Sequence, residues 1–373
     1  MARAAPPGAR ARIVAMPGRS SPLARYLFAA YCVLVAYASL HPLTGWRDLG
    51  LSPLEFIAAP WPKYYTGFDV GANFIAYAPL GALAVLALRP RLRGGAAIAF
   101  ATAAGLLLSV GMEALQAYLP DRIPSNLDVL ANTTGAFAGA VAGNAVAPRL
   151  LEGGALARLR DRLVVPGNRA DLGLVLIGLW LFTQLNPETL LFGSGDLRSV
   201  LGLMPSVPHP AQTFIRIEAA VAMTNLVAAA LLAGLVLSPE AARRRVVLAL
   251  IAAALAVRTA AFAVLFEPAD AFEWATPGAL TGLALGTLIA LAALGLPRVP
   301  AATLAGLLVM AATVLVNIAP DNPYLAYTLA AWPQGHFLNF NGLTRLVSLA
   351  WPFAALAYLI LPAGTRATPA SPA

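Results

Sequence analysis

The sequence has few charged residues and a single cysteine. Charged side chains make up 11% of the 373 residues, whereas roughly a quarter is usual for a globular domain, and hydrophobic residues reach 59%. This shortage of charge excludes a disordered chain and a soluble nucleic-acid binder. The lone Cys32 excludes an internal disulfide and with it a secreted disulfide scaffold. A polytopic membrane protein is the class that fits.

Ten stretches of the sequence are long and apolar enough to cross a bilayer. A hydrocarbon core about 30 Å thick requires about twenty apolar residues of helix. Such runs begin near Leu23, Val70, Ala96, Leu127, Leu172, Phe214, Val246, Trp274, Pro300 and Leu343. The sequence therefore predicts an all-α polytopic membrane protein with about ten transmembrane helices.

The positive charge is carried almost entirely by arginine, in short clusters between apolar runs. These clusters lie at residues 3–25, 89–93, 149–169 and 243–245. They precede the first run and follow the second, fourth and sixth, so they all fall on one side, which the positive-inside rule identifies as the cytoplasm. We therefore expect both termini in the cytoplasm, and we attribute the formal charge of +8 to membrane orientation rather than to a nucleic-acid partner.

The first apolar run has two interpretations. Arg25 and the small-residue triplet 36–38 resemble the start and the cleavage site of a signal peptide. However, the run ends in Ser39-Leu40-His41-Pro42, and the fifth and ninth runs end similarly, at residues 184–187 and 317–320. Because the same exit recurs after internal spans, we expect an uncleaved membrane anchor.

Further similarities indicate an internal repeat. Residues 79–84 in the second run resemble residues 352–357 in the tenth, and the glycine pair of 135–139 recurs at 278–282. We interpret the chain as a unit of four helices, a second unit of four helices and a half unit of two. Because each unit has an even number of spans, the copies have the same orientation in the membrane. The predicted domains are a basic cytoplasmic tail (1–21), a four-helix unit (22–147), a basic cytoplasmic linker (148–171), a degenerate four-helix unit (172–297), a two-helix half unit (298–362) and a cytoplasmic tail (363–373).

Polar residues gather at the ends of the first four spans that lie opposite the arginine clusters. Glu113 and Gln116 are three residues apart and share one helix face, as do Asp128 and Asn132 at a spacing of four. The whole set is Asn73, Tyr77, Glu113, Gln116, Arg122, Ser125, Asp128 and Asn132. We expect these residues to meet at the depth of the outer leaflet, around an outward-opening ligand-binding pocket.

The sequence leaves a functional and a structural interpretation of this set open. An acidic residue at the centre of a membrane helix costs about 2.5–3.5 kcal/mol, so Glu113 should be buried and paired, with Arg122 as the expected partner. On the structural side, Ser125 and Asp128 fit a helix N-cap, and Asn132 fits a hydrogen bond to a neighbouring helix. Aligning Pro120 with Pro268 places Ala261 at the position of Glu113, so only the first unit carries the polar set.

These residues also resemble the signature of the VanZ-like membrane proteins. The resemblance rests on Asn73 with Tyr77-Ala78-Pro79-Leu80-Gly81, on Glu113-Ala114-Leu115-Gln116, and on Arg122, Ser125, Asp128, Asn132 and Gly135. It covers roughly residues 22–147 and implies a multi-pass protein of the bacterial cytoplasmic (inner) membrane. The family name implies a link to glycopeptide-type antibiotic resistance.

Three functions are consistent with the sequence, and we favour the first. It is a non-enzymatic envelope protein that binds a membrane lipid or a lipid-linked ligand through Glu113, Arg122 and Asp128. The second is a transporter or flippase, in which Glu113 changes protonation, but the inner halves of the spans are almost wholly apolar. The third is an intramembrane enzyme with Glu113 and Asp128 as acid and base, but no nucleophile motif accompanies them.

No catalytic residue, cofactor or metal site is predicted. The three histidines, His41, His209 and His336, are far apart and have no metal-ligand spacing. Arg258 stands out inside the seventh apolar run, where an unpaired guanidinium is costly. We expect it to extend to the membrane surface or to meet Glu218 in the sixth run.

Overall fold

The computed structural model describes residues 22–48, 50, 52–151, 154–202, 210–266, 268–319 and 338–361. Apart from an isolated bridge between Val164 and Leu237, the regular structure in these ranges is helical. The elements are α1 (Pro22–Leu40), η1 (Glu55–Ile57), α2 (Gly67–Leu88), α3 (Gly94–Gln116), α4 (Asn126–Leu151), α5 (Ala155–Leu163), α6 (Asn168–Thr183), α7 (Arg198–Leu201), α8 (Ala211–Val236), α9 (Arg243–Leu265), η2 (Pro268–Asp270), α10 (Pro277–Ala293), α11 (Arg298–Ile318) and α13 (Leu338–Ile360).

The predicted fold class is confirmed, because the chain is an all-helical, multi-pass membrane protein. Each of the ten predicted runs coincides with a helix. Seven of these helices are long and apolar enough to cross a membrane: α1, α2, α3, α8, α9, α11 and α13. The other three are α4, which has 26 residues rich in glycine and polar groups, α6 with 16 residues and α10 with 17.

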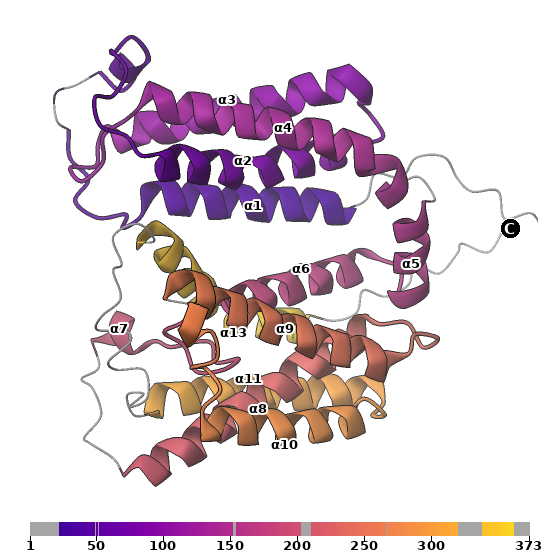
Figure 1. The fold of residues 1–373 in the computed structure, drawn as a ribbon. Coiled ribbons are helices and arrows are strands. Elements are labelled where there is room, and N and C mark those ends of the chain that lie inside the picture. Colours follow the sequence, from indigo (N-terminus) through magenta and orange to yellow (C-terminus); the bar gives the residue numbers. More distant parts are fainter. Residues whose placement is uncertain are drawn as a thin grey trace, which may run out of the picture.

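The helices form two bundles that lie side by side (Figure 1). Helices α1 to α4 make up the first bundle, and α6, α8 to α11 and α13 make up the second. The central helix of the second bundle is α8, and 72% of the residues in its most apolar stretch are buried. Helix α1 contacts α6 and α13 and so joins the two bundles.

The structure contains a short helix that the sequence analysis missed. Helix α5 lies within the stretch that we expected to be only a basic linker, and it runs across one end of the bundles (Figure 1). Its Arg160 forms an ion pair with the buried Asp171 at the start of α6. The nearby amide of Val165 donates to the carbonyl of Val236 at the end of α8, at 3.0 Å. These contacts attach the connection between the bundles to the second bundle.

A row of glycines brings α4 against α2. A Cβ atom added at Gly135, Gly139 or Gly143 would come closer than 3.0 Å to backbone atoms of α2. Small residues allow this kind of close approach, and close packing is the main source of helix association in a membrane. The two backbones are therefore in direct contact below the polar end of the bundle.

Glycines play the same part in the second bundle, between α10 and α8. A Cβ atom added at Gly278 or Gly282 would come closer than 3.0 Å to atoms of α8. The two bundles differ elsewhere, because α3 packs extensively on α4, whereas α9 has its main contacts with α6, α8 and η2. The repeat of four, four and two helices therefore stays a prediction.

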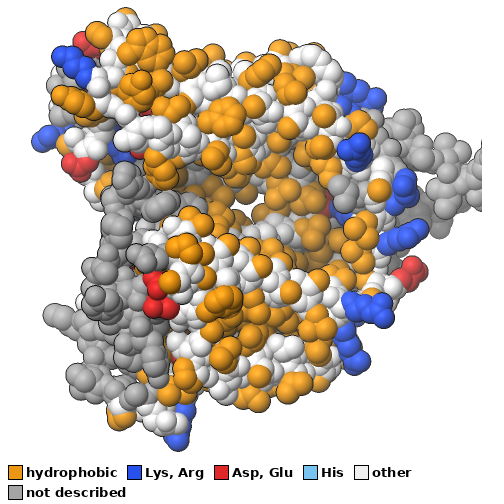
Figure 2. Space-filling model, viewed as in Figure 1, with side chains coloured by type: hydrophobic (Ala, Val, Ile, Leu, Met, Phe, Trp, Pro, Cys, Tyr) orange, Lys and Arg blue, Asp and Glu red, His pale blue; other side chains and the backbone are white. Residues whose placement is uncertain are grey.

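The surface agrees with a membrane-embedded protein. Hydrophobic side chains cover the long sides of the helices, and most of the visible Lys and Arg side chains lie at the end that carries α5 (Figure 2). We call this the basic end of the molecule. Its cytoplasmic orientation stays a prediction, and the predicted tails 1–21 and 363–373 lie outside the described residues.

Candidate functional site

The candidate site lies at the other end of the first bundle, where α3 ends and α4 begins. The chain leaves α3 through two tight turns, with Leu119 N–H donating to the Gln116 carbonyl at 2.9 Å and Arg122 N–H to the Leu119 carbonyl at 3.1 Å. Ser125 then precedes α4, and its hydroxyl accepts from the Asp128 amide at 3.4 Å. The N-cap expected from the sequence is thus present, with a long hydrogen bond.

Glu113 is buried, with only 3% of its surface exposed. Its Oε2 atom accepts a hydrogen bond from the backbone amide of Ser125 at 2.8 Å. This bond holds the start of α4 against α3. The sequence analysis predicted a buried Glu113 but named Arg122 as its partner, whereas the hydrogen bond comes from the main chain. Arg122 and Asp128 lie near enough to act on the carboxylate electrostatically.

A second buried contact connects α3 to α4 one turn deeper. Asn132 donates from Nδ2 to the hydroxyl of Ser109 at 2.9 Å, and both side chains are buried. The sequence analysis did not name Ser109, although it lies four residues before Glu113 and therefore on the same helix face. Tyr77 of α2 is buried close to Ser109. Within the described part of the chain, the Tyr77 hydroxyl and Asn132 Oδ1 have no hydrogen-bond partner.

The remaining predicted residues attach this centre to α2 and to the end of α1. Asn73 lies near the Asp128 carboxylate. Gln116 donates from Nε2 to the Ser39 carbonyl at 2.9 Å. Arg122 donates from Nη2 to the His41 carbonyl at 2.6 Å. Every residue has a backbone carbonyl, so a sequence does not show which carbonyls accept from a side chain. The contacts of Gln116 and Arg122 with the end of α1 were therefore not predicted.

All eight predicted residues are therefore brought to one end of the first bundle. Their polar groups provide two carboxylates, one guanidinium, and a buried hydroxyl and amide oxygen without partners. This excess of acceptors and negative charge suits a ligand that carries hydrogen-bond donors or a positive charge. The two cavities that stand out in the described structure lie elsewhere, so an outward-opening pocket at this site stays a prediction.

His41 connects the site to the second bundle. Its Nδ1 atom lies 3.1 Å from the Tyr37 hydroxyl, and its ring packs against Gly342 of α13. Burial lowers the pKa of His41, and the nearby charges of Arg122 and Arg345 lower it further. Burial also lowers the pKa of Arg122, an effect that the carboxylates of Glu113 and Asp121 oppose.

The lowered pKa of His41 predicts a loss of stability in acid. When the pKa is lower in the folded than in the unfolded protein, the unfolded protein binds the proton first, and stability falls as the pH drops below about 6.5. A His41→Gln variant should lose less thermal stability than the unmodified protein over this range. The midpoints of thermal unfolding in detergent, measured above and below that pH, test this. An equal drop for both proteins would contradict it.

In the second bundle, Arg258 lies near Glu218, as one of the two expectations stated, but its hydrogen bonds go to the main chain. It is 1% exposed, so it does not extend to the membrane surface. Its guanidinium donates to the backbone carbonyls of Asn186 and Thr189, in the connection after α6, and lies 5.0 Å from the centre of the Phe262 ring. Glu218 acts on it electrostatically, without taking these hydrogen bonds. Arg258 therefore anchors a connection between helices.

Comparisons with known proteins bear on the first bundle alone. No curated protein and no solved structure matches this chain. Residues 24–146, about a third of the chain, match the model of the VanZ/LLP1 family. This stretch runs from α1 into α4 and contains all eight predicted site residues, so the predicted resemblance is confirmed. The first bundle of this multi-pass membrane protein is a VanZ-like unit.

Proposed function

We propose that the VanZ-like unit binds an amphiphilic or lipid-linked ligand at the outer face of the bacterial cytoplasmic membrane. The observation that carries the proposal is the buried Glu113 carboxylate, which lies among polar groups from α2, α3 and α4 at one end of the first bundle. A buried acid in a membrane is costly. If Glu113 served only to hold the start of α4, the site would not need the buried Tyr77 hydroxyl and Asn132 Oδ1, which have no hydrogen-bond partner within the described part of the chain.

The acid excess of the site suggests the chemistry of the ligand. Glu113 and Asp128 face one basic side chain, that of Arg122. A headgroup with an amine, amide or several hydroxyls would donate to the carboxylates and to Asn132 Oδ1. Its acyl or isoprenoid part would remain in the bilayer beside the apolar helix surfaces. The family match makes resistance to glycopeptide-type antibiotics the phenotype to examine first.

Binding is better supported than transport or catalysis. A transport path would have to continue toward the basic end, but Gly139 and Gly143 hold α2 and α4 in backbone contact below the site. Buried small residues, among them Ala97, Ala101 and Ala140, fill the inner half of the bundle. An acid and base pair alone, without a nucleophile motif in the sequence, supports an enzyme less well.

A Glu113→Gln variant tests the proposal, with Asp121→Asn as its matched control. Glutamine keeps the shape and can still accept from the Ser125 amide, whereas Asp121 is an exposed acid in the same connection. Both changes remove one negative charge. The probe is the total lipid extract of the expression host, added to purified protein and followed by native mass spectrometry. We expect Glu113→Gln to reduce the retained lipid about tenfold, since hydrogen bonds to charged groups contribute about 1.5–3 kcal/mol.

The same variants separate the functional interpretation from the structural one. Under the proposal, Glu113→Gln accumulates normally and keeps its thermal midpoint while it loses bound lipid and any effect on teicoplanin susceptibility in a sensitive host. Asp121→Asn should behave like the unmodified protein. A Glu113→Gln variant that retains the same lipids, or one that simply unfolds at lower temperature, would contradict the proposal.

A further inference from the structure

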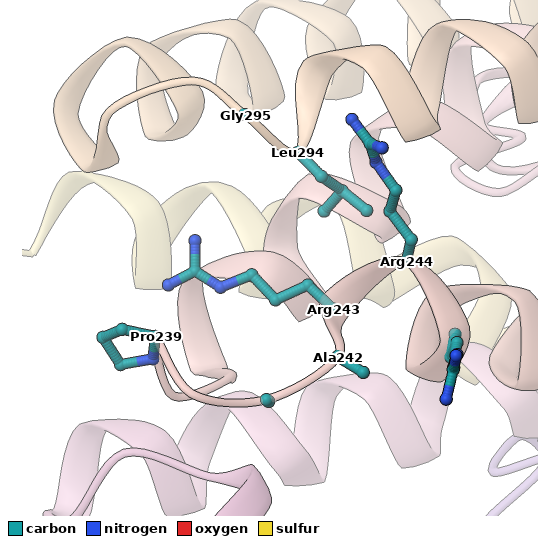
Figure 3. Close-up of a pocket in the computed structure, with 8 residues that line it drawn as sticks. Pro239, Ala242, Arg243, Arg244, Leu294 and Gly295 are labelled. Atoms are coloured by element: carbon teal, nitrogen blue, oxygen red, sulfur yellow. The ribbon is translucent and has the colours of Figure 1, made fainter.

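A second feature lies at the basic end of the second bundle, far from the VanZ-like site. A cavity of about 420 Å³ opens between the α8–α9 connection and the turn that joins α10 to α11. It is lined by Arg243, Arg244 and Arg245, by Pro239, and by Leu294 with Gly295. Arg243 and Arg244 extend from the start of α9 on either side of Leu294 (Figure 3).

Among the described residues, no acidic side chain pairs with the arginines of this cavity. They are the first residues of α9, and the first turn of that helix contains no acidic residue. A helix N-terminus already carries a partial positive charge, so arginines there are disfavoured. Arg243 directs its Nε atom to the Ser238 carbonyl at 3.3 Å.

The surroundings of the cavity place it where lipid headgroups lie. Helices α9 and α11 begin here and α10 ends here, so the cavity is at the end of the membrane-spanning region. Exposed apolar side chains flank it on the same elements: Leu248 on α9, Leu296 in the α10–α11 turn and Val299 on α11. A molecule bound by the arginines would therefore have its other part against an apolar surface.

We propose that this cavity binds the phosphate group of an anionic phospholipid from the leaflet at the basic end. The planar guanidinium of arginine matches a phosphate with two parallel hydrogen bonds. Basic pockets between transmembrane helices bind anionic headgroups. The lipid supplies the missing negative charge at the start of α9, and its acyl chains lie along the exposed apolar side chains. This site is independent of the function proposed for the first bundle.

The test uses the purified full chain and a pair of charge-matched double variants. Arg243→Gln with Arg244→Gln removes two arginines of the cavity. Arg91→Gln with Arg162→Gln removes two exposed arginines from the same end that do not line it. Native mass spectrometry with added phosphatidylglycerol or phosphatidylcholine measures lipid retention. We expect the unmodified protein and the control to bind phosphatidylglycerol more tightly than phosphatidylcholine. The cavity variant should bind phosphatidylglycerol about tenfold more weakly than the unmodified protein.

A further variant and a soluble competitor complete the test. Arg243→Lys with Arg244→Lys keeps the charge but not the paired hydrogen bonds, so it should bind with intermediate affinity and show that the site, rather than the fold, has changed. Inorganic phosphate should not compete at the concentration of added lipid. Equal retention of both lipids, an unchanged cavity variant, or full displacement by inorganic phosphate would overturn the proposal, and the last result would assign a soluble phosphate instead.

Discussion

Replacing Gly139 with alanine is expected to force α2 and α4 apart and to lower the thermal midpoint of the protein strongly. A Cβ atom at this position would come closer than 3.0 Å to the carbonyl group and the Cα atom of Ala78. These are backbone atoms in the middle of a helix, so no side-chain rotation relieves the contact. Overpacking typically costs about 1–3 kcal/mol, and we expect Gly139→Ala to reach the upper end of that range.

Gly111→Ala is the matched control for this prediction. Gly111 lies in α3, and a Cβ atom there would have no neighbour within 4 Å. Because alanine favours a helix more than glycine by about 1 kcal/mol, this variant should be as stable as the unmodified protein or slightly more so. Tryptophan fluorescence during thermal unfolding in detergent compares the two. A Gly139→Ala variant as stable as Gly111→Ala would show that α2 and α4 do not depend on backbone contact.

The helical fold and its glycine contacts were largely predictable because they leave periodic traces in the sequence. Apolar runs of membrane length located each helix of the two bundles. Glycines recur every fourth residue, at 135, 139 and 143, on the face of α4 that lies against α2. Helix α5 was missed because it is short and basic and resembles a polar connection.

The sequence analysis named the polar residues that gather at this end of the first bundle, but not the hydrogen bonds that they form. Helix periodicity grouped Glu113 with Gln116 and Asp128 with Asn132. It could not show that the amide of Ser125 is the donor to Glu113, or that the carbonyls of Ser39 and His41, at the end of α1, accept from Gln116 and Arg122. Every residue has these backbone groups, so only the fold decides which of them meet a side chain.

The second bundle also contains a buried acid, which the alignment of Pro120 with Pro268 did not reveal. Its buried acid is Glu218, which packs against Gly278 and lies near the hydroxyl of Thr276, the N-cap of α10. In the first bundle, Glu113 holds the start of α4 in a comparable way. However, Glu218 comes from the second helix of its bundle, α8, and Glu113 from the third. A residue-by-residue comparison therefore found alanine where a glutamate was sought.

Replacing Arg258 with methionine is expected to cost about 3 kcal/mol or more in the free energy of unfolding. The change leaves the Thr189 carbonyl without its donor, leaves the Asn186 carbonyl with the Thr189 hydroxyl alone, and leaves the buried Glu218 without its counter-charge. Unpaired buried polar groups cost about 1–3 kcal/mol each, and an uncompensated buried charge costs more. The matched control is Arg298→Met, because Arg298 also donates to a carbonyl, that of Leu235 at 2.7 Å, but is exposed.

A double variant identifies which of these losses dominates. If the uncompensated carboxylate is the larger cost, Arg258→Met with Glu218→Gln should recover part of the thermal stability that Arg258→Met loses, because glutamine removes the charge. If the lost hydrogen bonds to the carbonyls dominate, the double variant should be no more stable than the single one. Equal midpoints for Arg258→Met and Arg298→Met would contradict the anchoring role itself. Glu218 also lies near Thr276, the N-cap of α10. Recovery of thermal stability in the double variant would therefore show that Glu218 links Arg258, which binds the connection after α6, to the start of α10.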